Sequence, residues 1–106
     1  MAKKVKFART DGIKPVKKNG AFNLRSPIGF RLMPGEARSI KLGISADKPM
    51  ITFLPQRLKR FDGNLKHFDA NEDVVAELKN EGKDPIFIEV GDTLLRAIVF
   101  ETLDEL

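Results

Sequence analysis

The chain has 106 residues, a formal net charge of +4 and 42% hydrophobic residues, which predicts one globular domain with a core of its own. It contains no Cys and one His, which excludes disulfides and thiolate metal sites and argues against a His-based metal site. The sequence shows no signal peptide and no apolar run of membrane-spanning length, so we expect a soluble cytosolic protein with no membrane partner and no cofactor.

The charge is unevenly distributed along the chain. Residues 1–60 contain fifteen Lys and Arg against three Asp and Glu, a net +12, and residues 61–106 contain four against twelve, a net −8. In a β-sandwich the two halves interleave, so this asymmetry lets oppositely charged strands pair within one chain. It also suits head-to-tail contacts between copies, in which one surface meets a different one. The pairing within one chain is the favoured interpretation.

Residues 1–19 form a basic segment in which Asp11 is the sole acid. Asp11-Gly12 is a hairpin-turn signal and predicts that Lys4–Arg9 pairs with Ile13–Lys17. The segment is therefore either a Lys-rich edge hairpin, which we favour, or an arm that contacts polyanions such as nucleic acid without sequence specificity. The residues available for contact with a polyanion or partner are Lys3, Lys4, Lys6, Lys14, Lys17 and Lys18.

The next segments alternate between apolar and polar residues and predict short strands. Residues 28–32 alternate and lead into a Pro34-Gly35 turn, after which Ile40, Leu42 and Ile44 share one face of a strand. Met50–Pro55 predicts a strand that stops at the proline. Residues 56–71 are polar and irregular. Between residues 72 and 79 local propensity alone favours a helix.

The last third of the sequence returns to clear strand signals. Residues 80–85 form a turn, and Ile86, Ile88 and Val90 share one face of a strand. After a Gly91-Asp92 turn, Leu94–Phe100 is almost continuously apolar, which predicts a central strand covered on both faces. Residues 1–106 are thus predicted to form a single all-β domain, a jelly roll or β-sandwich of about eight to ten short strands with little helix.

Several segments, taken in order and spacing, resemble the dUTPase family. The family's G-Y-D-L segment matches Ala21-Phe22-Asn23-Leu24, its P-G-E turn matches Pro34-Gly35-Glu36, its T-G-I matches Leu42-Gly43-Ile44, and its late G-D-R-I-A-Q-L-V segment matches Gly91 to Val99. The resemblance covers roughly residues 20 to 101. It implies a dUTPase-like jelly roll that assembles as a homotrimer, and it implies a strand at residues 72–79 in place of the helix.

The same resemblance implies that the catalytic residues are lost. The G-Y-D-L carboxylate falls on the neutral Asn23. In the G-V-I-D-x-D-Y-R-G segment, the water-activating Asp falls on His67, the aromatic that contacts the base falls on Ala70, and Asp69 matches the second carboxylate. Of the P-R-S-G segment only Pro55 keeps its place and Arg57 is displaced by one position, while the Gly-rich C-terminal arm has no counterpart.

Two kinds of chemistry remain open to this sequence, general-base catalysis and cation binding. His67 lies near Asp69 and has the proton affinity of a general base, and Asp62 with Asp69 offers two carboxylates to a cation. An exposed loop histidine and solvated carboxylates are the simpler interpretation. We therefore assign no catalytic, cofactor-binding or metal-binding residue.

The sequence thus predicts a non-enzymatic structural or interaction protein on a dUTPase-like trimeric scaffold. By fold-level analogy, a viral virion protein such as a phage capsid decoration protein fits, located in the host cytoplasm or the virion. A divergent nucleotide pyrophosphatase acting on dUTP is the first alternative. A polyanion-binding accessory protein that uses residues 1–19 is the second. The partner, the source organism and any residual nucleotide binding stay open.

Overall fold

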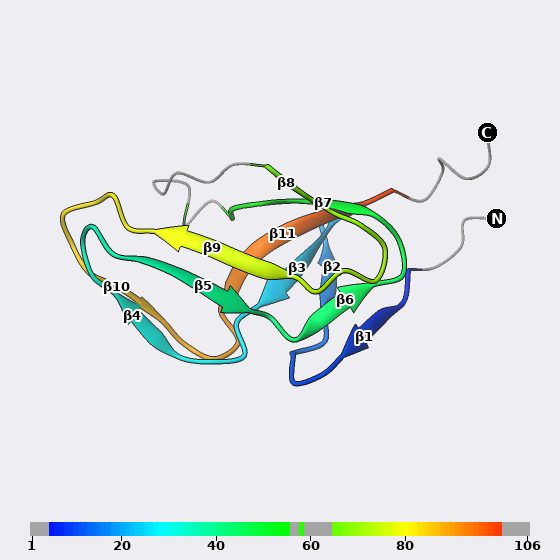
Figure 1. The fold of residues 1–106 in the computed structure, drawn as a ribbon, viewed down its shortest axis with the longest axis horizontal. Helices are drawn as coiled ribbons and strands as arrows, with labels where there is room; N and C mark the ends of the chain where they lie inside the picture. Colours follow the sequence, from blue (N-terminus) through cyan, green and yellow to red (C-terminus); the bar gives the residue numbers. More distant parts are fainter. Residues whose placement is uncertain (1–4, 56–57, 59–64, 101–106) are drawn as a thin grey trace.

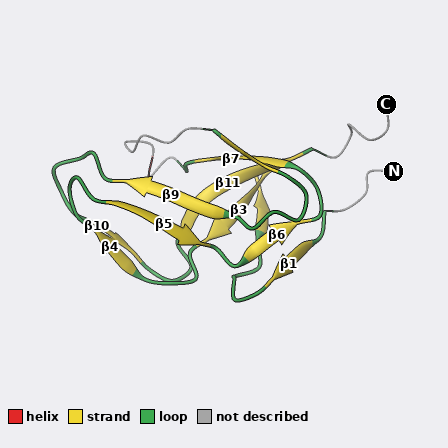
Figure 2. Ribbon diagram, viewed as in Figure 1, coloured by secondary structure: helices red, strands yellow, loops and turns green. Residues whose placement is uncertain are grey.

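A computed structural model defines residues 5–55, 58 and 65–100 of the protein. The regular elements in these ranges are eleven strands (Figure 2): β1 (Phe7–Arg9), β2 (Val16–Lys18), β3 (Ala21–Arg25), β4 (Phe30–Leu32), β5 (Ala37–Lys41), β6 (Ile44–Ala46), β7 (Met50–Phe53), β8 (Lys66–Phe68), β9 (Val75–Lys79), β10 (Ile86–Ile88) and β11 (Thr93–Val99). None of the described residues belongs to a helix long and apolar enough to cross a membrane.

The strands form four antiparallel sheets (Figure 1). The largest has five strands in the order β2-β3-β11-β7-β8, and the other three are the two-stranded ribbons β1-β6, β4-β10 and β5-β9. Two strand pairs, β2-β3 and β7-β8, join strands that follow each other in the sequence. All other pairs join strands from distant parts of the sequence. The all-β prediction is confirmed, and the strand count of eleven slightly exceeds the expected eight to ten.

The core lies between the five-stranded sheet and the ribbons. Its buried side chains come from all four sheets, and we call the face of the five-stranded sheet that supplies them the inner face. Strand β7 shows the alternation that produces it, since Met50 and Thr52 are each 1% exposed while Ile51 and Phe53 are half-buried on the opposite, outer face. The β1-β6 ribbon covers one end, where the Phe7 and Phe22 rings meet edge to face with centroids 5.0 Å apart.

The predicted N-terminal hairpin is not formed. Strand β1 pairs with β6, and β2 pairs with β3, so the two strands lie in different sheets. The reason is the packing of Gly12, whose N–H donates to the Gly43 carbonyl at 3.2 Å. A Cβ at Gly12 would lie 2.4 Å from the Leu42 carbonyl oxygen, so only glycine permits this approach. The Asp11-Gly12 signal marks a crossing between sheets.

The Pro34-Gly35 turn forms as predicted. Gly35 has a φ of 81°, and the Glu36 N–H donates to the Met33 carbonyl at 2.9 Å. The strands on either side do not pair with each other, since β4 pairs with β10 and β5 with β9. The turn therefore leads the chain from one ribbon into another, and Asn80 secures it by accepting the Gly35 N–H at 2.7 Å.

Residues 72–79 contain strand β9, as the family resemblance implied. The helix that local propensity favoured there is wrong.

Strand β10 buries Ile86 and Ile88, but Val90 follows the strand's end and is 65% exposed. Strand β11 is central, between β3 and β7. A register shift between Thr93 and Leu95 lets Leu94 and Leu95 both point into the core. Its outer face is not covered within the described chain, because Ile98 is 49% exposed.

Candidate functional site

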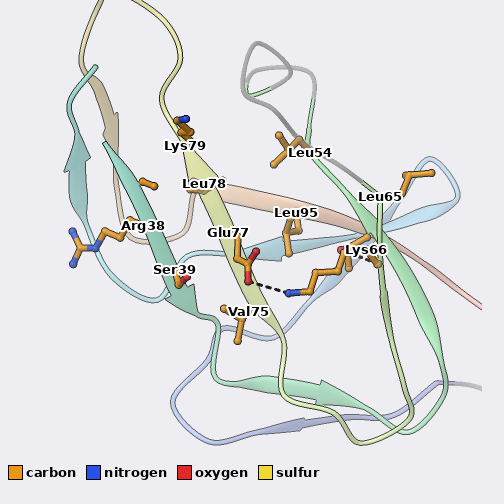
Figure 3. A pocket seen from close by; sticks show the side chains of 12 residues that line it. Arg38, Ser39, Leu54, Leu65, Lys66, Val75, Glu77, Leu78, Lys79 and Leu95 are labelled. Carbon is orange, nitrogen blue, oxygen red and sulfur yellow. Dashed lines mark hydrogen bonds and ion pairs between the residues drawn. The ribbon is translucent and has the colours of Figure 1, made fainter. Parts of the chain in front are cut away.

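A cavity of about 470 Å³ lies between the β5-β9 ribbon and the β7-β8 edge of the five-stranded sheet. Figure 3 shows its lining. Its floor is apolar and comes from the core, with Leu54, Leu78 and Leu95 at most 6% exposed. Its volume falls in the range of small-molecule pockets. The β5, β7, β8, β9 and β11 strands all contribute to it, so its shape depends on the long-range pairing of the fold.

The mouth of the cavity carries charge. Lys66 on β8 and Glu77 on β9 form an ion pair across it, with Nζ and Oε1 3.3 Å apart, and both side chains are well exposed. The Lys66 ammonium also lies 5.2 Å from the centre of the Phe68 ring. Thr52, which also lines the cavity, donates its hydroxyl proton to the Lys66 carbonyl at 3.3 Å. The pocket can therefore enclose an apolar group, with the Lys66–Glu77 ion pair at its mouth.

Asn23, the residue at the expected carboxylate position, lies on the outer face of β3. Its Oδ1 accepts a hydrogen bond from Arg96 Nε at 3.1 Å, and Arg96 Nη2 donates to the Lys18 carbonyl. This bond network joins β2, β3 and β11. Nearby, Arg25 Nη2 donates to the Lys14 carbonyl at 2.9 Å, and Arg25 Nε is buried without a hydrogen-bond partner among the described residues. The two guanidinium groups thus bond to neutral oxygens.

His67 and Asp69 lie at the opposite edge of the same sheet. His67 Nδ1 is 3.6 Å from Asp69 Oδ1, and their side chains are 54% and 80% exposed. The turn that follows is closed by Glu72, whose Oε1 accepts the Asp69 N–H at 2.8 Å, and it is attached to β6 by the Asn71 N–H, which donates to the Ala46 carbonyl. Within the described ranges, no group of three or more His, Asp or Glu is placed to hold a metal ion.

The structure does not bring Asn23 and His67 together in one chain. Strands β11 and β7 lie between β3 and β8, which separates Asn23 from His67 by about 14 Å at the usual strand spacing. A joint role for them in one reaction would require a different copy of the chain.

No protein-family model matches the sequence, and no curated protein sequence matches it. Among solved structures, a mutant dUTPase from phage phi11 of S. aureus superposes with a TM-score of 0.76 at 11% identity, over 93% of this chain and 91% of that one. The Staphylococcus bacteriophage 80alpha dUTPase with dUPNHPP gives 0.74 at 10% identity, over 92% and 82%. The chain has a dUTPase-like fold. The 80alpha enzyme is described as controlling transfer of virulence genes by a proto-oncogenic G protein-like mechanism, and the phi11 enzyme as coordinating a structural Mg(II) ion.

The structure describes some of the remaining predicted positions and not others. Pro55 is described, whereas Arg57, Asp62, Lys3 and Lys4 lie outside the described residues. The described lysines of the N-terminal segment are all exposed on or beside β1 and β2: Lys6, Lys14, Lys17 and Lys18.

Sequence reasoning missed the cavity and the Arg96 network. Both depend on pairs far apart in the sequence, such as Arg96 with Asn23, which are 73 residues apart. The one available signal was Arg96 itself, a charged residue inside the apolar run Leu94–Phe100.

Proposed function

We propose that the chain is a non-enzymatic interaction protein that uses the dUTPase-like fold as a homotrimeric scaffold, and that it decorates a larger assembly such as a phage capsid. The observation that carries the proposal is the state of Asn23. The family's carboxylate position holds a neutral amide here, and the amide oxygen is taken up by Arg96 in a network that joins three strands. Asn23 therefore stabilises the sheet by holding Arg96 between β2, β3 and β11.

The site of the second expected carboxylate supports the same proposal. The Asp69 side chain is 80% exposed and is paired only loosely with the neighbouring His67. General-base catalysis needs a base held within hydrogen-bond reach of its water by a fixed environment. An exposed pair at the edge of a sheet supplies little of that fixation within one chain.

The relatives in fold support a role that goes beyond hydrolysis. Phage dUTPases with this fold are described as controlling the transfer of virulence genes. In a homotrimer each surface is present three times, so contacts that are weak singly become tight when three sites on the target match the spacing. A threefold position in a viral shell provides such a match, and the proposal places the protein in the virion or in the host cytoplasm before assembly.

The enzymatic question is tested by incubating the protein with dUTP and Mg²⁺ and measuring pyrophosphate. We expect no release above the buffer control. Turnover that the Asp69→Ala substitution abolishes would establish the divergent pyrophosphatase instead.

The binding question is tested separately by co-sedimentation with the candidate assembly. We expect saturable, stoichiometric binding at low salt, where electrostatic contacts are strongest. Failure to co-sediment under that condition would remove the decoration role.

A further inference from the structure

The cavity between the β5-β9 ribbon and the β7-β8 edge has no part in the proposed function. Its volume of about 470 Å³ lies in the lower part of the range in which pockets bury most of the surface of a small molecule. Figure 3 shows that its lining has an apolar part, which includes Leu54, Leu78 and Leu95, and a charged part, which includes the Lys66–Glu77 ion pair. The cavity therefore has room for one small ligand with two chemically different ends.

The apolar part of the lining continues from the floor to the rim. Val75 on β9 is half-buried, and Leu65, directly before β8, is 72% exposed. A ligand that covers Leu65 removes apolar surface from water, which favours binding. The uncharged polar side chains of the described lining are Ser39 and Thr52, and Thr52 already donates its hydroxyl proton to the Lys66 carbonyl. A ligand that is apolar over most of its length therefore matches this lining best, because few side chains here can satisfy a buried polar group.

The charges at the mouth determine the other end of the ligand. Three basic residues of the described lining, Arg38, Lys66 and Lys79, stand against the single acid Glu77. The Arg38 guanidinium lies 5.0 Å from the centre of the Phe30 ring, and Figure 3 shows it directed away from the cavity. The Lys66 ammonium has three N–H donors, and within the described chain Glu77 is its one hydrogen-bonded acceptor, at 3.3 Å. The mouth therefore suits an anionic group.

We propose that the cavity binds an amphiphile of the fatty-acid class, with a short aliphatic chain against Leu54, Leu78 and Leu95 and its carboxylate on Lys66. The carboxylate takes an ammonium proton that Glu77 does not use, so the ion pair between β8 and β9 is kept. Glu77 and Lys79 are two residues apart and lie on the same face of β9, so Lys79 adds positive charge to the mouth. This binding is independent of the decoration role and needs neither a nucleotide nor a second copy of the chain.

The test is calorimetric titration of the full chain with octanoate and with octanol, which has the same chain length and no charge. We expect octanoate to bind with one-to-one stoichiometry and to raise Tm, because a ligand that binds the folded chain stabilises it. We expect octanol to bind about 10-fold more weakly, because it cannot form a charge-assisted bond to Lys66. High salt should reduce this difference, because salt screens charges at an exposed mouth.

Substitutions at Lys66 test the position of the carboxylate. Lys66→Met removes the charge and keeps an unbranched side chain, so we expect it to weaken octanoate binding about 10-fold and to leave octanol binding unchanged. Lys66→Arg should retain octanoate binding to within about 3-fold, because the positive charge is kept. The control is Lys17→Met on β2, at an exposed lysine outside the cavity lining, which should bind both compounds as the wild type does.

Substitutions at Ser39 test the position of the aliphatic chain. Ser39 is exposed on β5 and lines the cavity, so Ser39→Phe occupies the space without changing the core. We expect Ser39→Phe to weaken the binding of both compounds at least about 10-fold, and Ser39→Ala to bind both as the wild type does. Thermal unfolding followed by circular dichroism verifies that both variants are folded.

Each contrary result refutes a defined part of the proposal. Equal affinity for octanoate and octanol, or an Lys66→Met variant that binds octanoate like the wild type, would show that Lys66 does not hold a carboxylate. An Ser39→Phe variant that binds normally would place the ligand outside the cavity, and the absence of binding at millimolar octanoate would refute the site altogether. None of these results bears on the decoration role, which co-sedimentation tests without either compound.

Discussion

Replacing Asn80 by Ala is the substitution with the clearest expected effect on the fold. Asn80 is 0% exposed, and its side chain makes three hydrogen bonds. Nδ2 donates to the Leu32 carbonyl at 3.0 Å and to the Asp84 carbonyl at 2.9 Å, and Oδ1 accepts the Gly82 N–H at 2.9 Å. One side chain thus joins the end of β4 to the β9-β10 connection.

The magnitude follows from these three bonds. Each contributes about 0.5–1.5 kcal/mol net, so the three together contribute about 2–4 kcal/mol. We expect Asn80→Ala to lower the free energy of unfolding by about 2–4 kcal/mol, which for a domain of this size lowers Tm by about 10–25 °C. Asn80→Asp should cost at least as much, because it keeps the acceptor for Gly82 but places a carboxylate oxygen against two carbonyl oxygens.

The assay is thermal and urea unfolding followed by circular dichroism. The matched control is Glu81→Ala, whose side chain is 47% exposed and 3.9 Å from Lys79 Nζ. This exposed pair should change stability by less than about 0.5 kcal/mol. An Asn80→Ala variant that melts within about 2 °C of the wild type would refute the reasoning, because it would mean that water replaces all three bonds at no cost.

Three further predictions concern the core, a close backbone approach and the N-terminal segment. Phe68→Ala, at a side chain that is 1% exposed, should cost about 3–5 kcal/mol in urea unfolding. Gly12→Ala should lower Tm far more than Gly29→Ala, since the added Cβ would lie 2.4 Å from a carbonyl oxygen at Gly12 and 3.4 Å from one at Gly29. Deletion of residues 1–17 should lower Tm because it removes β1, its cover over Phe22 and most of the edge strand β2. An unchanged Tm with loss of binding to DNA would show instead that these residues are a polyanion-binding arm.

The elements that depend on neighbouring residues could be predicted from the sequence. The Pro34-Gly35 and Gly91-Asp92 turns lie where expected, and both glycines have the positive φ that such turns require. The alternation around Ile40 and Met50 indicated strands there because a strand repeats every two residues and buries one face. The single strand expected to run from Ile40 to Ile44 is wrong, since β5 ends at Lys41 and β6 begins at Ile44 in another sheet.

The choice of partner strands could not be predicted from local pattern. Asp11-Gly12 has the composition of a hairpin turn, yet contact with Gly43 directs the two strands to different sheets. Residues 72–79 favoured a helix locally, and pairing with β5 made Val75–Lys79 a strand because it buries Ala76 and Leu78 on one face.

In the candidate site, too, single residues could be predicted from the sequence, but the contacts between distant strands could not. The family resemblance places Asn23 at a carboxylate position, and this assignment stays a prediction. The bond of Asn23 to Arg96 could not be predicted, because the pairing of β3 with β11 brings the two residues together. The same holds for Lys66 and Glu77, which lie in separate sheets and meet across the cavity.

The central position of β11 also determines the order in which the protein can fold. Its partners β3 and β7 precede it by tens of residues, as the 73-residue separation of Asn23 and Arg96 illustrates. During synthesis the β2-β3 and β7-β8 pairs can form early, but each keeps an unpaired edge until β11 has left the ribosome and inserted between them. Sheets closed by such distant strands fold slowly, and exposed edges invite association with other unfinished chains. Yield of native protein should therefore fall with the concentration of nascent chains and improve when translation is slowed or the temperature is lowered.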